Sequence, residues 1–143
     1  MANLAQASNV LLTTKLAITA TIARKRFVKP DGSGYPASGG NALGVSLFPG
    51  VSGDTLDIAK SGFIVVTAGG SLNRGDWVMS DASGQAIAAT ALGIASGGTT
   101  VTSAAANGTT DIVGGMPPTV VLGQVVECGG ASAASGDDVL IYM

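Results

Sequence analysis

The segment Ser71-Leu72-Asn73-Arg74-Gly75-Asp76-Trp77-Val78 has a counterpart 50 positions earlier, in Thr21-Ile22-Ala23-Arg24-Lys25-Arg26-Phe27-Val28. The same offset continues into the residues that follow, where Asp81-Ala82-Ser83-Gly84 matches Asp31-Gly32-Ser33-Gly34. In each of these motifs the aspartate can accept a hydrogen bond from the backbone two residues on, and the glycine can adopt a positive φ. The repeat predicts two equivalent strands, each of which ends in the same kind of turn.

Two further matches extend this repeat along the chain. Ala42-Leu43-Gly44-Val45 resembles Val121-Leu122-Gly123-Gln124, and Gly53-Asp54-Thr55-Leu56-Asp57-Ile58 resembles Gly136-Asp137-Asp138-Val139-Leu140-Ile141. An internal repeat of this length indicates that one structural unit occurs twice. We therefore predict a single domain over residues 15–143, built from halves at about 17–60 and 67–143, with an insertion at about 90–119. Residues 1–14 are predicted to form an N-terminal arm.

Short runs of Val, Ile, Thr and Leu, bounded by Gly, Asp, Asn, Ser or Pro, predict strands rather than helices. The predicted strands are Leu16–Ala20, Arg26–Lys29, Ala42–Leu47, Thr55–Ala59, Phe63–Thr67, Trp77–Ser80, Val120–Glu127 and Asp138–Tyr142. Many short strands joined by glycine-rich turns are typical of an all-β fold. The fold class expected is a small β-barrel or a β-tulip-like sandwich of two pseudo-repeated halves.

The composition excludes much enzyme chemistry. Gly, Ala, Ser and Thr make up about half of the 143 residues, and the chain has no histidine and one cysteine. Nucleophilic triads that need an imidazole and Cys/His zinc sites are therefore excluded, and one thiol cannot form an internal disulfide. Cys128 follows an apolar run and is interpreted as a small core residue. We expect no enzyme activity, no cofactor, no metal site and no catalytic residue.

Charge and hydropathy limit the partners. The net charge is −2 and the charged residues amount to 11%, which gives no overall attraction to nucleic acid or to an anionic membrane. The first ten residues lack the basic start and apolar centre of a secretory signal, and no apolar run is long enough to span a membrane. We expect neither nucleic acid nor a membrane as a partner.

Two features indicate an interaction surface. The uncharged arm offers Leu4, Val10, Leu11 and Leu12, which can either fray or pack on a neighbouring subunit. Four of the seven basic residues gather within six positions, at Arg24, Lys25, Arg26 and Lys29. A basic edge strand can discourage aggregation, or it can dock an acidic partner surface. These eight residues are the candidate interface.

The equivalent aromatic residues Phe27 and Trp77 are predicted to be core anchors of the two halves, since a large ring contributes most when it is buried. In the insertion, Asn107-Gly108 between Thr-rich runs predicts a hairpin that projects from the domain.

The residues from Gly69 to Ala86 are similar to the "G-x-I-x-x-G-D-x-V-x-x-D-x-x-G-x-A" pattern of tailed-phage capsid decoration proteins, also called structural cement proteins. Leu122-Gly123-Gln124-Val125 and Gly136–Ile141 resemble that family's closing "LG-x-A/V … G-D-x-V-x-V", and Asn41–Ser46 resembles its first-half "LG-V". The resemblance covers about residues 15–143. The first half departs from it, because Ala23-Arg24-Lys25-Arg26 replaces the Gly-Asp motif.

This resemblance implies a non-enzymatic subunit, made in the cytoplasm of the bacterial host, that trimerises and binds the outer surface of the mature phage head. The partners implied are the major capsid protein and two further copies of the chain.

Two other classes remain open from the residues alone. A small carbohydrate- or ligand-binding β-clip module would need a concave site with convergent polar groups around Trp77 or Tyr35. An enzyme would need Asp76 or Asp138 to be buried in a cleft with a strongly shifted pKa.

Overall fold

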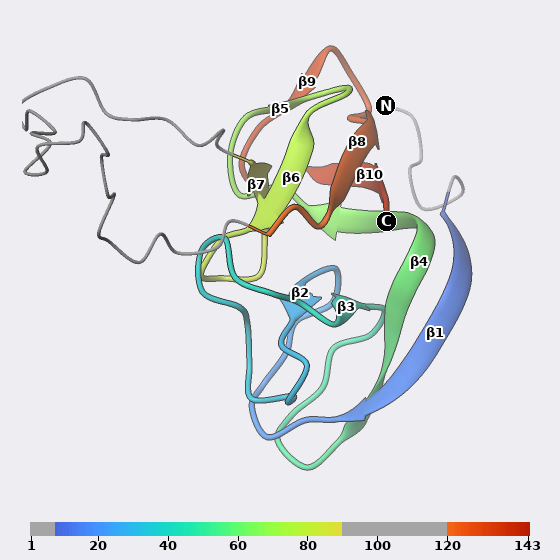
Figure 1. Cartoon of the computed structure of the whole chain (residues 1–143), viewed down its shortest axis with the longest axis vertical. Coiled ribbons are helices and arrows are strands. Elements are labelled where there is room, and N and C mark those ends of the chain that lie inside the picture. The colour runs from blue at the N-terminus through green and yellow to red at the C-terminus, as the bar shows by residue number, and fades with distance from the viewer. Residues whose placement is uncertain (1–7, 90–119) are drawn as a thin grey trace, which may run out of the picture.

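The computed structural model describes residues 8–89 and 120–143, and in these ranges the protein is built from β-strands without any helix (Figure 1). The prediction of an all-β fold is therefore confirmed. The strands are β1 (Asn9–Ala17), β2 (Phe27–Val28), β3 (Gly44–Ser46), β4 (Thr55–Thr67), β5 (Leu72–Asn73), β6 (Trp77–Ser80), β7 (Ala86–Ala88), β8 (Gly123–Glu127), β9 (Ser132–Ala133) and β10 (Asp138–Tyr142).

One antiparallel sheet follows the order β2-β3-β4-β10-β8-β6-β7, with β1 paired to β4, and β5 pairs with β9 in a second small sheet. The long strand β4 belongs to both parts of the molecule. In Figure 1 it runs from the lower part, with β2 and β3, into the upper part, with β5 to β10. An isolated bridge links Ala68 to Ala86, but the sheet does not close into a barrel. The architecture is that of an open, strongly bent sandwich.

The internal repeat of the sequence reappears in the strand register. Phe27 pairs with Val45 and Val45 with Ala59. In the second half the equivalent partners are Trp77 with Gln124 and Gln124 with Tyr142. The repeat also extends to contacts outside the long strands, since the bridge between Ile22 and Gly50 corresponds to the pair Leu72 and Ala133. Two copies of one unit thus make the fold.

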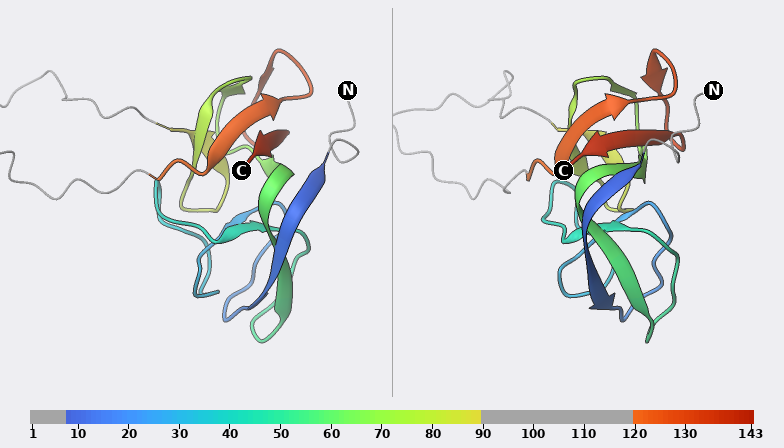
Figure 2. Two further views of the ribbon diagram at one scale, coloured as in Figure 1. Left: turned by 45° about the vertical axis from the view of Figure 1, so that its right-hand side comes forward. Right: turned by 90° about the vertical axis from the view of Figure 1, so that its right-hand side faces the viewer.

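Strand β1 begins at Asn9 and pairs with β4 of the same chain along its whole length (Figure 2). Its pairing of Thr13 with Ala59 and of Ala17 with Thr55 matches that of Phe63 with Tyr142 and of Thr67 with Asp138. The N-terminal arm predicted at residues 1–14 therefore overlaps β1 from Asn9 onward. Residues 13 and 14 belong to the repeat, and residues 9–12 continue the same strand through a bulge. Residues 1–7 lie outside the described part, as does the insertion at 90–119 with its predicted hairpin.

Each half has its own core. The first contains Ile18, Ile22, Val28, Leu56 and Ile58, all nearly or fully buried. Their counterparts in the second half belong to a larger core: Ala68, Leu72, Val78, Val139 and Ile141. That larger core also takes in Phe27, Val45 and Ala59 from the first half. The two halves are therefore joined by apolar packing, which is the largest favourable contribution to folding.

The turns repeat as well. The backbone N–H of Ser33 donates to Asp31 Oδ1 (2.9 Å), and that of Ser83 donates to Asp81 Oδ1 (2.8 Å), as the shared Asp-x-Ser-Gly motif predicts. A second turn occurs three times among the described residues, where a glycine of positive φ precedes Asp54, Asp76 or Asp137. Each of these carboxylates accepts a hydrogen bond from the backbone N–H three residues earlier. These aspartates form turns.

Candidate interaction site

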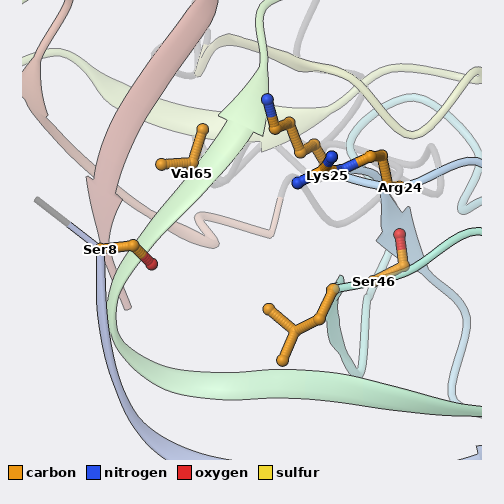
Figure 3. Close-up of a pocket in the computed structure, with 6 residues that line it drawn as sticks. Ser8, Arg24, Lys25, Ser46 and Val65 are labelled. Atoms are coloured by element: carbon orange, nitrogen blue, oxygen red, sulfur yellow. The ribbon is translucent and has the colours of Figure 1, made fainter. Parts of the chain in front are cut away.

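A small hollow of about 120 Å³ brings together parts of the chain that are distant in sequence. Figure 3 shows its wall, where Ser8 lies just before β1, Val65 on β4, Ser46 on β3, and Arg24 and Lys25 in the turn before β2. Leu47 completes the lining. The start of β1 and the basic cluster, the two features predicted to form an interaction surface, thus meet at one place.

Ser46 holds the turn that carries Arg24 and Lys25, which we call the basic turn. Its side chain is 1% exposed, and its hydroxyl donates to the carbonyl oxygen of Ala23 at 2.6 Å. The backbone N–H of Lys25 donates to the carbonyl oxygen of Ser46 (2.8 Å), and the N–H of Ser46 donates to that of Arg26 (2.9 Å). A buried polar group that is fully hydrogen-bonded holds its neighbours in one geometry. The direction of Arg24 and Lys25 is therefore set by the fold.

The basic side chains differ in their availability. Lys25 is half-buried, and its Nζ lies 2.5 Å from Asp138 Oδ2, which links the two halves. Arg24 is exposed and forms no ion pair with a described residue. Arg26 and Lys29 are half-buried, and Nη1 of Arg26 is buried without a hydrogen-bond partner among the described residues. Of the four, Arg24 is the cation best placed to meet a partner.

The apolar residues of the candidate interface also differ in exposure. Val10 is half-buried and packs against the larger core, whereas Leu11 and Leu12 are 68% and 54% exposed. Leu4 lies outside the described residues. The structure thus leaves Leu11 and Leu12 on an edge strand as possible contact residues, and their role at an interface stays a prediction.

A second, larger hollow of about 530 Å³ lies in the first half, between the segment 21–23, Tyr35 and the loop 49–54. This is where a ligand-binding module would need convergent polar groups. The Tyr35 hydroxyl accepts a hydrogen bond from the Ala23 N–H (2.9 Å), and Asp54 Oδ2 accepts one from the Val51 N–H (2.9 Å). Both groups are already engaged within the chain, and Trp77 does not line this hollow.

The carboxylates also fail to form a reactive pair. Asp76 accepts hydrogen bonds from the backbone N–H and the side-chain amide of Asn73, and Asp138 pairs with Lys25 while its side chain stays 40% exposed. Neither is buried in a cleft, as an acid or base acting on a substrate would have to be. Among residues 8–89 and 120–143, no three acidic or cysteine side chains gather into a potential metal site.

Two other carboxylates show how the fold uses charge. The Arg74 guanidinium hydrogen-bonds to Glu127, which lowers the pKa of the Glu127 carboxyl and raises that of Arg74. The backbone N–H of Ser33 lowers the pKa of Asp31 in its turn. Both effects favour the charged form of an acid that is hydrogen-bonded in the folded state. They stabilise local structure near the surface.

The prediction that Trp77 is a core anchor is wrong. Its counterpart Phe27 is fully buried, but Trp77 is 57% exposed. In the first half, the sheet face that carries Phe27 packs against the second half. The equivalent face of the second half, which carries Trp77, is exposed. Cys128 is buried as predicted, at 6% exposure.

In the described part of the chain, the structure holds no helix long and apolar enough to cross a membrane.

Comparison with solved structures shows that this architecture occurs elsewhere. The N base of the head fiber gp8.5 of bacteriophage phi29 superimposes with a TM-score of 0.59, at 16% sequence identity, over 92% of each chain. At this identity the likeness concerns the fold. No curated protein matches the sequence.

A family model described as phage cement protein matches residues 5–116, which is more than half of the chain. The chain therefore belongs to the phage cement proteins. This confirms the resemblance seen in the sequence. Membership implies a non-enzymatic structural role, association with the phage capsid and a location in the virion.

Proposed function

We propose that this protein decorates the outer surface of the mature phage head as a homotrimer, binds the major capsid protein and stabilises the shell. Membership of the phage cement family is the observation that carries the proposal. The protein would be made in the bacterial cytoplasm and added to the head there. The similarity in fold to a protein described as the N base of a phage head fiber supports the proposal.

The contact with the capsid would be centred on the hollow beside Arg24. The site is held rigidly by Ser46, its rim carries an exposed guanidinium, and the start of β1 lies beside it. An arginine presents several donors in a fixed geometry, which suits carboxylates on a partner surface. The hollow would therefore receive an acidic side chain of the capsid protein.

Stabilisation would follow from binding alone. A ligand that attaches to the assembled shell and not to its dissociated parts shifts the equilibrium toward the shell by mass action. A trimer presents three such contacts at once, so that a weak individual contact becomes a strong joint one when the geometry allows simultaneous engagement.

The test uses expanded empty heads and the purified full-length protein. We expect co-sedimentation of the protein with heads, and a loss of about tenfold in affinity for Arg24→Glu, equivalent to about 1.4 kcal/mol. Lys60→Glu is the matched control, because Lys60 is exposed and does not line the hollow. Full binding by Arg24→Glu would move the contact to another surface. Failure of the unaltered protein to bind any heads would overturn the proposal itself.

A further inference from the structure

The outer face of the second half carries a row of exposed aromatic side chains. Trp77 pairs with Gln124, Gln124 with Tyr142, and Tyr142 with Phe63, across four neighbouring strands. Directly opposed residues of an antiparallel sheet place their side chains on one face. Trp77, Tyr142 and Phe63 are 57%, 52% and 37% exposed. We call Trp77, Gln124, Tyr142 and Phe63 the aromatic row.

The row is ordered and uncharged. The rings of Phe63 and Tyr142 have their centroids 5.4 Å apart and are tilted by 48°, a favourable arrangement for two aromatic side chains. The side-chain amide of Gln124 donates to the carbonyl oxygen of Gly75 at 3.0 Å, so the polar group in the row is already hydrogen-bonded. Aromatic side chains on a fixed scaffold are the residues that contribute most to protein–protein binding.

The first half shows what covers this kind of surface. The counterparts of Trp77, Gln124 and Tyr142 are Phe27, Val45 and Ala59, and all three are fully buried in the larger core, against residues of the second half. The Phe27 N–H also donates to the Gly84 carbonyl oxygen across this junction (2.7 Å). Thr13, which corresponds to Phe63, stays exposed at the margin. One unit of this fold therefore covers the equivalent face of another unit.

We infer that the aromatic row binds a second copy of this chain. The inference deepens the proposed function, because it rests on the proposed trimer and names the surface that forms it. The same strand pairs are buried by a neighbouring unit within the chain. The second half presents them again, with the larger side chains Trp77 and Tyr142, and no unit among residues 8–89 and 120–143 covers them. A contact in which one end of a subunit covers the other end of the next is head-to-tail, and it forms a closed ring when the rotation allows.

The row also differs in chemistry from the proposed capsid contact. The hollow at Arg24 and the ion pair of Lys25 with Asp138 are charged, whereas the aromatic row has no charged member. Interfaces between copies of one chain are more apolar than transient ones. The two surfaces therefore fit two partners: the charged site fits the capsid and the row fits another subunit.

The test measures the mass of the full-length protein by sedimentation equilibrium over a wide concentration range. Trp77→Ser and Tyr142→Ser should each raise the dissociation constant of the oligomer by at least about 30-fold, as expected for central aromatic residues. Phe48→Ser is the matched control, since Phe48 is 60% exposed but lies outside the row. Thermal unfolding of each variant shows whether it folds. If Trp77→Ser does not fold, the test rests on Tyr142→Ser, which removes an exposed ring near the end of β10.

Trp77 is the single tryptophan of the chain, so intrinsic fluorescence reports on the row directly. Its emission should shift to the blue on association and return to the red on dilution, in step with the mass. A tryptophan that is already shielded in the dilute monomer, with no change on association, would overturn the inference.

Head binding separates this inference from the proposed function. Unchanged self-association of both row variants together with lost head binding would assign the row to the capsid and overturn the inference alone. An oligomer that forms through the row but does not bind heads would contradict the proposed function and leave the inference intact.

Discussion

Lys25 and Gly75 occupy equivalent positions in the two halves, and both have a positive φ, 59° and 87°. Their backbone N–H groups donate to equivalent carbonyl oxygens, of Ser46 and Val125, each at 2.8 Å. The turn is therefore conserved in geometry although Ala-Arg-Lys-Arg replaces the Gly-Asp motif in the first half. Lys25 is the one described residue other than glycine with a positive φ, and its ammonium group pairs with Asp138 in the second half.

The first prediction concerns this lysine. A left-handed conformation costs a residue with a Cβ about 1–2 kcal/mol, whereas glycine adopts it freely. Lys25→Gly should therefore stay within about 1 kcal/mol of the unaltered protein, because relief of backbone strain offsets a partly exposed ion pair worth at most about that amount. Lys25→Val should lose about 2 kcal/mol or more, since a β-branched residue is poorly suited to this φ. Urea unfolding measures both, and equal stability of the two variants would contradict the argument.

The repeated Leu-Gly motif gives the second prediction. A Cβ at Gly44 would collide with the carbonyl oxygen of Ala59, and one at Gly123 would come within 2.6 Å of the carbonyl oxygen of Tyr142. Gly44→Ala and Gly123→Ala should each destabilise the fold by about 1–3 kcal/mol, the usual effect of overpacking. Gly130→Ala is the control, because the contact closest to its Cβ would be at 3.9 Å. Thermal unfolding that ranks Gly130→Ala with the other two would exclude the steric explanation.

Cys128 supplies the third prediction. Its thiol is buried with Sγ 3.6 Å from the Leu72 carbonyl oxygen, and desolvation by burial raises its pKa. Because the thiolate is the reactive form, native Cys128 should react with iodoacetamide far more slowly than the urea-unfolded chain at the same pH. The folded pKa lies above the unfolded one, so this group stabilises the fold fully below its unfolded pKa. That contribution is lost as the pH rises through the folded pKa. Equal rates of alkylation in both states would show that the thiol is accessible.

The predicted arm gives the fourth prediction. Removal of residues 1–14 would delete most of the pairing between β1 and β4 and so destabilise the whole domain. Removal of residues 1–7 leaves β1 intact, and we expect it to weaken head binding or trimerisation without a change in unfolding temperature. The matched control is Ala17→Ser, which alters an exposed residue of β1 outside the candidate interface and leaves residues 1–7 in place. If the shortened chain binds heads and associates as tightly as the full chain, the arm has no role at an interface.

Much of the fold can be predicted from the sequence because each turn and strand within the repeated unit is specified by residues close together in the chain. The Asp-x-Ser-Gly turns and the Leu-Gly strands are set by residues a few positions apart, and these were found where the structure has them. The short strands β5, β7 and β9 escaped prediction. Unlike β2 and β3, which are as short, none of them has two large apolar side chains in it or directly beside it. Residues 9–12 have no counterpart in the repeat, so their pairing with β4 left no trace in the pattern.

The surfaces are harder to predict, for a physical reason. Phe27 and Trp77 occupy equivalent positions in the repeat, and they differ in exposure because one half is covered by the other. That depends on tertiary packing. The meeting of Ser8 with Arg24 at one hollow likewise depends on tertiary packing, which brings the residue before β1 and the turn before β2 to the same stretch of β4. The basic cluster itself was visible in the sequence, but only the structure separates exposed Arg24 from Lys25, which is engaged with Asp138.

The proposal that the protein stabilises a phage head is tested most directly by calorimetry of expanded empty heads with increasing amounts of bound protein. We predict that the disassembly temperature rises with occupancy and stops rising when the sites are full, because a ligand specific for the assembled shell stabilises it by mass action. Heads saturated with bound protein that disassemble at the temperature of bare heads would contradict the account.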